Sequence, residues 1–251
     1  MLNDKNEQEY LVLTAIYNSE EPLGSGAIRE ELRLSGFELS EATAGRLLRE
    51  YDRQGCTLRI GFRGRHLTDK GKKRLGELIK ERERNHFGNE LLNTLEIKSK
   101  DELIDILVAR RVIEKETARL AALNATDLDI DHLKRIIERH NMHYLSGIGG
   151  AEEDIQFHRL IGKMAGNKVL MAAMDLIRQD GQMSPVFEHI RKHVNSTVVS
   201  DHRKILSAIA SRKPDRAEVA MIEHINNIIE DVERYWAEPD GSNENVLFET
   251  R

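Results

Sequence analysis

The chain has 251 residues, and its 43 acidic and 38 basic side chains give a formal net charge of −5. No apolar run approaches the ~20 residues that a membrane-spanning helix needs, and the N-terminus lacks a basic-then-apolar signal pattern, so we expect a cytoplasmic protein without membrane partners. Cys56 is the only cysteine, which excludes an internal disulfide and a cysteine metal cluster. Mild acidity argues against wholesale coating of nucleic acid, but it leaves room for a local basic patch.

Three short helices followed by a hairpin are predicted for the N-terminal part. The apolar spacing predicts helices over residues 6–19, 26–34 and 41–55. The stretch "CTLRIGFRGRHLTDKG" that follows mixes β-branched, aromatic and glycine residues, which indicates a β-hairpin with a basic, glycine-rich tip. This is the order of a winged helix-turn-helix, in which the third helix enters the major groove and the wing lies along the DNA backbone.

Basic residues gather in this part of the chain, where they outnumber acidic residues by about two to one between Ala42 and Arg84. We predict that side chains of the third helix and the hairpin contact DNA: Thr43, Arg46, Arg49, Arg63 and Arg65. The alternative is a solvated face in which these arginines pair with Glu50 and Asp52. The segment resembles winged-helix domains of bacterial regulators in general, but it lacks the "PSER…VSR…V…AL…L" pattern usual in the N-terminal domain of GntR-superfamily regulators.

The rest of the chain is predicted to be helical. Residues 1–75 form the DNA-binding domain in this interpretation, and residues 76–100 form a charged connector helix and linker. Residues 101–237 contain amphipathic segments separated by Gly, Asn, Ser or Pro, with one break expected at "SP" near Pro185, and indicate an antiparallel helical bundle. Residues 238–251 are expected to be a flexible tail. The predicted fold class is therefore mainly α, a winged helix-turn-helix followed by an all-α bundle.

Polar side chains fall on the apolar faces of three predicted helices. Asp154 and His158 stand one turn apart on a stripe that continues with Phe157, while His202 and His224 interrupt apolar stripes further along the chain. A buried carboxylate without a partner costs several kcal/mol, and a divalent cation such as Zn²⁺, Ni²⁺ or Mn²⁺ would remove that cost. The alternative is that these are hydrogen-bonded core histidines, because a chain with ten histidines contains pairs at this spacing by coincidence.

Three blocks of residues 101–237 resemble one family of ligand-binding domains. "RRVIEKETARLAAL", "DIQFHRLIGKMAGNKVL" and "SDHRKILSAIASRKPDRAEVAMIEHI" are similar in order and spacing to the FadR-type C-terminal (FCD) domain of GntR-superfamily transcription regulators. The resemblance implies a metal bound by Asp154, His158, His202 and His224 in the centre of the bundle. It also implies a small organic acid at that metal, with Arg110 as part of its pocket.

Together these features predict a ligand-responsive transcription regulator. We expect a homodimer on a palindromic double-stranded operator, with a zinc ion (nickel and manganese as alternatives) and a small carboxylate effector in each helical domain. Three alternatives stay open: a metal-sensing repressor in which the ion is the signal, a metal-dependent enzyme, and a winged helix that binds RNA or protein. An enzyme is not expected, because the sequence fixes no additional general base. Enzyme activity would also leave the basic winged helix unexplained.

Overall fold

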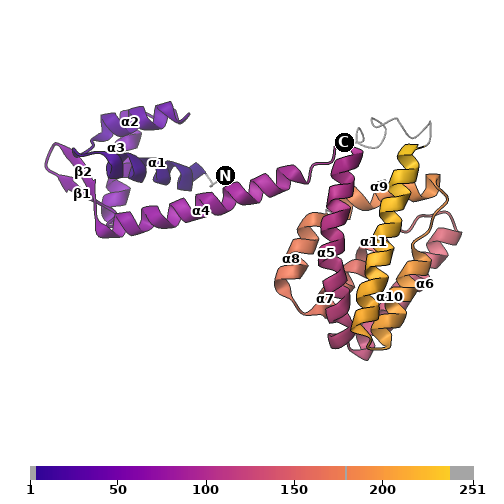
Figure 1. Cartoon of the computed structure of the whole chain (residues 1–251). Coiled ribbons are helices and arrows are strands. Elements are labelled where there is room, and N and C mark those ends of the chain that lie inside the picture. Colours follow the sequence, from indigo (N-terminus) through magenta and orange to yellow (C-terminus); the bar gives the residue numbers. More distant parts are fainter. Residues whose placement is uncertain (1–3, 179, 238–251) are drawn as a thin grey trace. The chain divides into compact units, whose positions relative to one another are not determined.

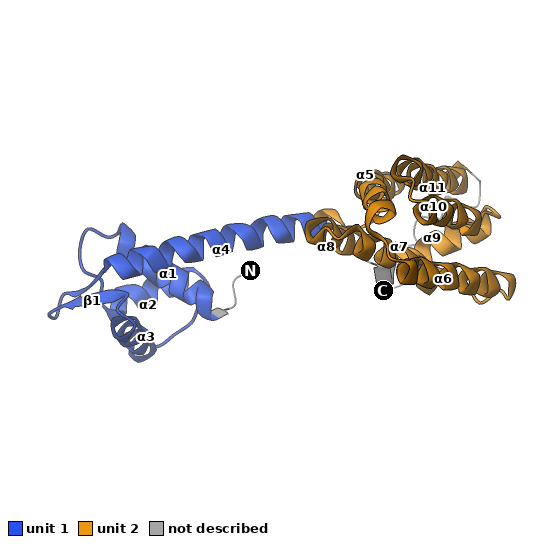
Figure 2. Ribbon diagram, turned by 90° about the horizontal axis from the view of Figure 1, so that it is seen from below, with its two compact units in different colours: residues 1–93 blue, residues 94–251 orange. Residues whose placement is uncertain are grey.

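The computed structural model describes residues 4–178 and 180–237, so the tail expected at 238–251 lies outside the described residues. The chain divides into two compact units, residues 1–93 and residues 94–251 (Figure 2). Within the described part of the chain, no helix combines the length and the apolar character needed to cross a membrane.

The first unit has the element order predicted for a winged helix-turn-helix. Three helices, a two-stranded antiparallel hairpin and a long helix follow one another (Figure 1): α1 (Asp4–Asn18), α2 (Ser25–Leu34), α3 (Glu41–Arg53), β1 (Thr57–Ile60), β2 (Gly64–Leu67) and α4 (Asp69–Thr94). The apolar faces of the helices meet in a single core that includes Leu13, Ile16, Ile28, Leu32, Leu48 and Leu78. The prediction of a winged helix is therefore confirmed.

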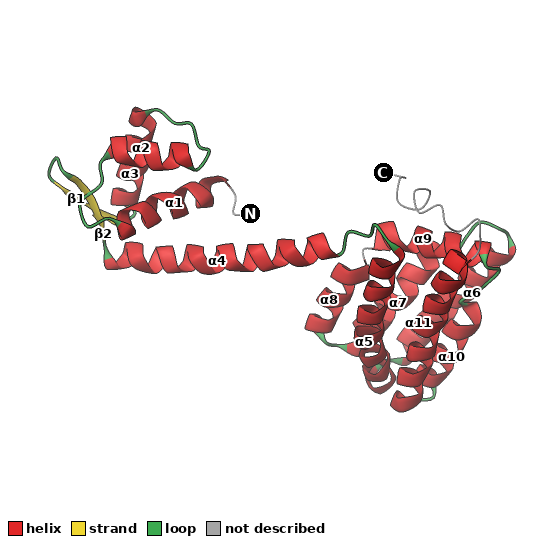
Figure 3. Cartoon of the chain, turned by 45° about the horizontal axis from the view of Figure 1, so that its top comes forward, coloured by secondary structure: helices red, strands yellow, loops and turns green. Residues whose placement is uncertain are grey.

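Local sequence signals set the position of α3 and of the wing. The hydroxyl of Ser40 accepts a hydrogen bond from the backbone N–H of Thr43 and so caps the start of α3. In the hairpin (Figure 3), Gly64 has a φ of +139°. A Cβ atom at Gly64 would lie 2.4 Å from the backbone of Leu23, so only glycine fits there. Backbone hydrogen bonds between Leu23 and Arg65 (3.1 and 2.9 Å) tie the wing to the segment before α2.

The connector is one continuous helix of 26 residues, α4. Leu75 and Leu78 bury its N-terminal part in the core of the first unit. Beyond Leu78 its side chains are exposed or half-buried as far as Thr94. Ser99 then caps the next helix by accepting a hydrogen bond from the N–H of Glu102.

Helices are the only regular secondary structure among the described residues of the second unit. These are α5 (Lys100–Asn124), α6 (Asp127–Leu145), α7 (Ala151–Ala165), α8 (Lys168–Arg178), α9 (Asp180–His193), α10 (Val199–Ala210) and α11 (Pro214–Ala237). Helix α5 packs against α7, α8, α10 and α11 (Figure 1), and its buried side chains Leu103 and Leu107 join Phe157 and Ile205 in one core. The predicted all-α bundle is confirmed.

One predicted helix break is wrong. The sequence analysis predicts that one helix ends and another begins next to Pro185. In the structure, Pro185 lies inside α9, which begins at Asp180. As the sixth residue of α9, Pro185 removes one backbone hydrogen bond of the helix, a cost that packing has to offset. The buried side chains of Met183, Phe187 and Ile190 continue the apolar face past the proline, so packing favours a single helix.

Candidate metal centre

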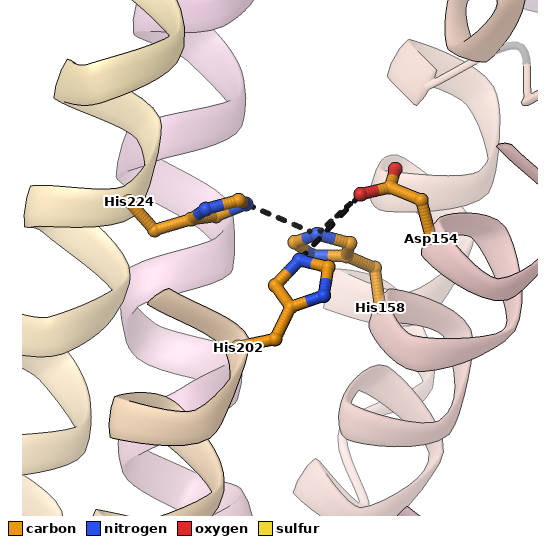
Figure 4. Close-up of side chains that lie close together, drawn as sticks. All are labelled: Asp154, His158, His202 and His224. Carbon is orange, nitrogen blue, oxygen red and sulfur yellow. Dashed lines mark hydrogen bonds and ion pairs between the residues drawn. The ribbon is translucent and has the colours of Figure 1, made fainter. Parts of the chain in front are cut away.

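Four buried polar side chains from three helices meet in the core of the second unit. Asp154 and His158 lie one turn apart on α7, His202 lies on α10, and His224 lies on α11 (Figure 4). One ligand atom from each side chain lies within 4.8 Å of the others. This is the set of residues that the resemblance to the FCD domain singled out.

The distances between these atoms suit a single small cation. The Nε2 atoms of His158 and His224 are 3.3 Å apart, and Oδ1 of Asp154 lies 3.5 Å from Nε2 of His202 and 3.7 Å from Nε2 of His158. Bonds of about 2.1 Å to a tetrahedral ion would separate ligand atoms by about 3.4 Å. Oδ1 of Asp154 and Nε2 of His202 are buried and have no hydrogen-bond partner among the described residues, which a bound cation would supply.

Asp154 is held by an arginine through the oxygen that faces away from the cluster. Nη2 of Arg178, at the end of α8, donates to Oδ2 of Asp154 at 3.0 Å, and this leaves Oδ1 directed at the histidines. Burial alone would raise the pKa of Asp154, but the facing His158 ring and the positive charge of Arg178 outweigh it and hold the pKa well below its usual value. The carboxylate is therefore ionised and available as a ligand.

His158 is oriented by a buried glutamate. Its Nδ1 lies 2.5 Å from Oε2 of Glu114 on α5, which points Nε2 at the centre of the cluster. Burial, opposed by Glu114, lowers the pKa of His158 to about 4. The ring is therefore neutral near pH 7, as a metal ligand must be.

His202 and His224 are each fixed by a different neighbour. The ring of His202 stacks on Phe157 at a centroid distance of 3.9 Å and an angle of 16°. Nδ1 of His224 lies 3.8 Å from Oδ2 of Asp201, and that oxygen accepts a hydrogen bond of 2.7 Å from Asn227. Burial foremost depresses the pKa of His202 well below its usual value, so this ring is neutral too.

Arg110, predicted to bind an effector, lies in the same buried network. Its Nε donates to Oε1 of Glu114 at 2.7 Å, and Oε2 of that glutamate contacts His158. The guanidinium also lies over the ring of Phe187, 5.5 Å from its centroid. Nη2 of Arg110 is buried without a hydrogen-bond partner among the described residues, so it can still donate to a ligand.

The predicted DNA-contacting residues of α3 lie at its N-terminal and central turns. Arg46 and Arg49 are exposed, and Thr43 is half-buried with its hydroxyl 2.9 Å from that of Ser40. Nη2 of Arg46 donates to the Thr43 hydroxyl at 3.0 Å. Arg46 and Arg49 line a shallow basic hollow together with Asp52 and Arg53.

The two arginines of the wing have different surroundings. Arg63 is exposed in the turn between β1 and β2. Arg65 is only 8% exposed, and its guanidinium pairs with Asp52 at 2.9 Å. This pair ties β2 to α3, so the placement of Arg65 favours a structural role over the predicted contact with DNA.

Several charged residues of the buried network were not predicted from the sequence: Glu114, Arg178, Arg191, Asp201 and His140. Glu114 could have been found, because it follows Arg110 by four residues and so shares its helix face. The sequence gives no comparable signal for Arg178 or Arg191, since each stands at the C-terminal end of a helix where exposed basic residues are common.

Comparisons with known proteins agree with this architecture. The family model of the FCD domain matches residues 105–227, and that of the Ribonuclease R winged-helix domain matches residues 10–75. The Uxu operon transcriptional regulator of Escherichia coli strain K12 is 28% identical over 134 residues, which are 49% of this chain and 51% of that protein. The HTH-type transcriptional regulator LutR of Bacillus subtilis strain 168 is 24% identical over 65% of this chain and 76% of its own length.

Among solved structures, the chain matches that of Streptococcus agalactiae GntR. It is 19% identical with a TM-score of 0.45, and the match covers 90% of this chain and 99% of that one. The chain spans about half the length of the Uxu operon regulator that it matches. Both curated relatives are named as transcriptional regulators and neither as an enzyme.

Proposed function

We propose that the chain is a DNA-binding regulator of the GntR family with an FCD domain, and that its second unit binds a divalent metal ion and a small organic acid. The observation that carries the proposal is the meeting of four buried donors from three helices, with two of the facing atoms left without a partner. Imidazole and carboxylate ligands suit Zn²⁺ first, with Ni²⁺ and Mn²⁺ as alternatives.

The residues of the cluster have separate roles in this proposal. Asp154, His158, His202 and His224 would hold the ion, and the ion would supply positive charge and, by expanding its coordination beyond these four ligands, a position for an organic carboxylate. Arg110 stands beside the cluster through Glu114 and would donate from its unpartnered Nη2 to the same acid.

The metal part of the proposal is tested by elemental analysis of the purified full chain. We expect about one equivalent of a divalent transition metal per chain, and its loss when His202 and His224 are both replaced by alanine. His132→Ala is the matched control, since His132 is exposed on α6 outside the cluster. A wild-type chain that binds no added Zn²⁺, Ni²⁺ or Mn²⁺, or a double variant that keeps its metal, would refute this part.

The first unit would bind double-stranded DNA through α3 and the wing. Thr43, Arg46 and Arg49 would face the major groove and its phosphates, and Arg63 would contact the backbone at the wing. We propose that two copies of the chain form a homodimer on a palindromic operator with half-sites about one helical turn apart. Such a regulator would act in the cytoplasm, where the chromosome of a bacterium lies.

Salt dependence measures the predicted phosphate contacts without knowledge of the operator. In fluorescence anisotropy with a mixed-sequence 40-base-pair duplex, Arg46→Gln and Arg49→Gln should each reduce the slope of log affinity against log salt by about 1. Arg33→Gln is the control, because Arg33 is exposed on α2 and paired with Glu30. The same titration with duplex RNA separates a DNA-binding protein from an RNA-binding winged helix, and tighter binding to RNA would refute the proposal.

The effector can change DNA affinity only if it favours one arrangement of the chain over another. Helix α4 is the covalent link between the two units and is the element that would carry such a change. In the metal-sensing alternative the ion alone is the signal. DNA affinity measured with and without metal at a fixed concentration of organic acid distinguishes the two.

A further inference from the structure

Buried positive charges outnumber the carboxylates that contact them around the candidate metal centre. Arg110, Arg178 and Arg191 are 3%, 2% and 6% exposed. Glu114 accepts hydrogen bonds from Arg110 at 2.7 Å and from Arg178 at 3.4 Å, and Asp154 accepts one from Arg178 at 3.0 Å. The guanidinium of Arg191 has no hydrogen bond or ion pair with the described residues. A largely buried charge without an ion-pair partner is costly, so this place is suited to binding an anion.

Other acidic side chains of the second unit are engaged by other groups. Glu188 accepts from Lys192 at 2.7 Å, and Asp231 pairs with Arg234. Glu153 pairs with Arg139 at 3.6 Å and contacts His143 at 3.1 Å. Within the described residues, this leaves Asp154 as the carboxylate that acts most strongly on Arg191, and Asp154 is already bound to Arg178 and directed at the cluster.

Phe187 links the positions of Arg110 and Arg191. Phe187 and Arg191 stand one turn apart on α9, and the guanidinium of Arg110 lies 5.5 Å from the centroid of the Phe187 ring. Burial foremost lowers the pKa of Arg191, and the charge of Arg110 lowers it further while Asp154 opposes the shift. The two guanidiniums are therefore close enough to repel each other, and Nη2 of Arg110 has an unused donor.

We infer that the second unit binds an organic acid with two anionic groups, one directed to the metal centre and the other held between Arg110 and Arg191. The inference rests on the proposed function, because the first group needs the metal. Without an ion, the three arginines exceed Asp154 and Glu114 by one charge, and a divalent ion raises the surplus to three. A dianion offsets more of this surplus than a monoanion does, and the planar guanidinium fork matches a carboxylate in shape.

Pairs of acids that differ only in a terminal methyl or carboxylate group test this inference. Calorimetric titration of the Zn²⁺-loaded full chain should show succinate binding at least about 10-fold tighter than butyrate, and malate at least about 10-fold tighter than 2-hydroxybutyrate. Arg191→Met should abolish this difference while leaving the affinity for the monocarboxylates within about two-fold. Lys192→Met, a change at the exposed neighbour, should preserve the difference.

Zinc content and circular dichroism, measured on each variant, show whether the centre is intact. If Arg191→Met does not fold, Arg191→Lys keeps the charge but loses the planar fork, and it should reduce the preference for the dicarboxylate. Equal binding of both members of each pair to the wild type, or a preference that survives in a folded Arg191→Met variant, would overturn the inference and leave the proposed function standing. Failure of all four acids to bind the zinc-loaded chain would overturn the inference, and failure to bind any of the three metals would refute the proposed function itself.

Discussion

The ligand atoms of the candidate centre face one another because each side chain is fixed from behind by a different partner. Arg178 holds Asp154, Glu114 holds His158, and Phe157 stacks on His202. Such contacts determine which atom of a carboxylate or imidazole points at an ion. The geometry of the centre therefore depends on residues that would not bind the metal themselves.

Glu114→Gln tests this dependence. The substitution keeps the size of the side chain but removes the negative charge between Arg110, Arg178 and His158. We expect the free energy of unfolding of the metal-free chain to fall by about 3–5 kcal/mol, because buried cations lose their partner. Zinc affinity should fall by about 10–100-fold, because His158 is no longer oriented. Urea denaturation and competition with a zinc chelator measure the two effects.

Glu116→Gln is the control for this substitution. Glu116 lies on the same helix, and its i,i+3 pair with Arg119 is partly exposed, so its removal should cost less than about 1 kcal/mol. Equal effects of the two substitutions would show that Glu114 has no special role in the centre.

Gly150→Ala tests how closely the chain packs beside the centre. A Cβ atom at Gly150, which caps α7, would lie 2.2 Å from Nε2 of His140, a buried ring 5.4 Å from that of His202. We expect a loss of about 1–3 kcal/mol in the free energy of unfolding, because the His140 ring must shift within a packed core. Gly76→Ala, in the open on α4, should instead stabilise the chain by about 0.5–1 kcal/mol. Two effects of the same sign in thermal denaturation would contradict this account.

At the residue scale, the sequence predicted which side chains meet in the cluster better than it predicted the residues around them. Asp154 and His158 could be predicted because helical spacing alone puts them on one apolar face. Arg178 and Arg191 could not, because their burial depends on how α8 and α9 pack against α5 and α7. Arg65 resembled a surface arginine of the wing, yet its pairing with Asp52 depends on how the hairpin folds against α3.

At the level of elements, local signals determined most helix boundaries. Thr126 and Asp129 form a reciprocal capping box at the start of α6, and Gly166, with a φ of +71°, ends α7. The break predicted at Pro185 is wrong because the apolar face of α9 continues past the proline, and burial of that face outweighs the one backbone hydrogen bond that the proline removes. At this position, tertiary packing outweighed the helix-breaking tendency of the proline.

Thr126→Ala tests the capping box of α6. The change removes the hydroxyl that accepts the N–H of Asp129, and we expect the free energy of unfolding to fall by about 1 kcal/mol. Ser146→Ala, at the other end of α6, should have almost no effect, because Ser146 caps the helix through its backbone N–H. Urea denaturation of the two variants compares them, and an equal loss of stability would show that the cap contributes nothing.

At the scale of the whole molecule, the sequence predicted the order of the parts. A winged helix, a charged helical connector and a helical bundle follow from periodicity, glycine positions and charge distribution. The structure gives each unit a core of its own, one around Leu48 and the other around Phe157. Because the cores are separate, stabilisation of one unit need not pass to the other.

This separation predicts that metal removal weakens one unit selectively. An ion bound only by the folded second unit stabilises it by about 4 kcal/mol at a free concentration 1,000 times its dissociation constant.

The cluster joins α7, α10 and α11, so removal of the metal by a chelator should accelerate amide hydrogen exchange in these helices. Exchange in α1, α2 and α3, which belong to the other core, should stay unchanged. Mass spectrometry of the full-length chain with and without Zn²⁺ measures the amide hydrogen exchange of both units in one experiment. Equal acceleration in both would show that the two cores unfold as one, and no change in either would show that no stabilising metal is bound.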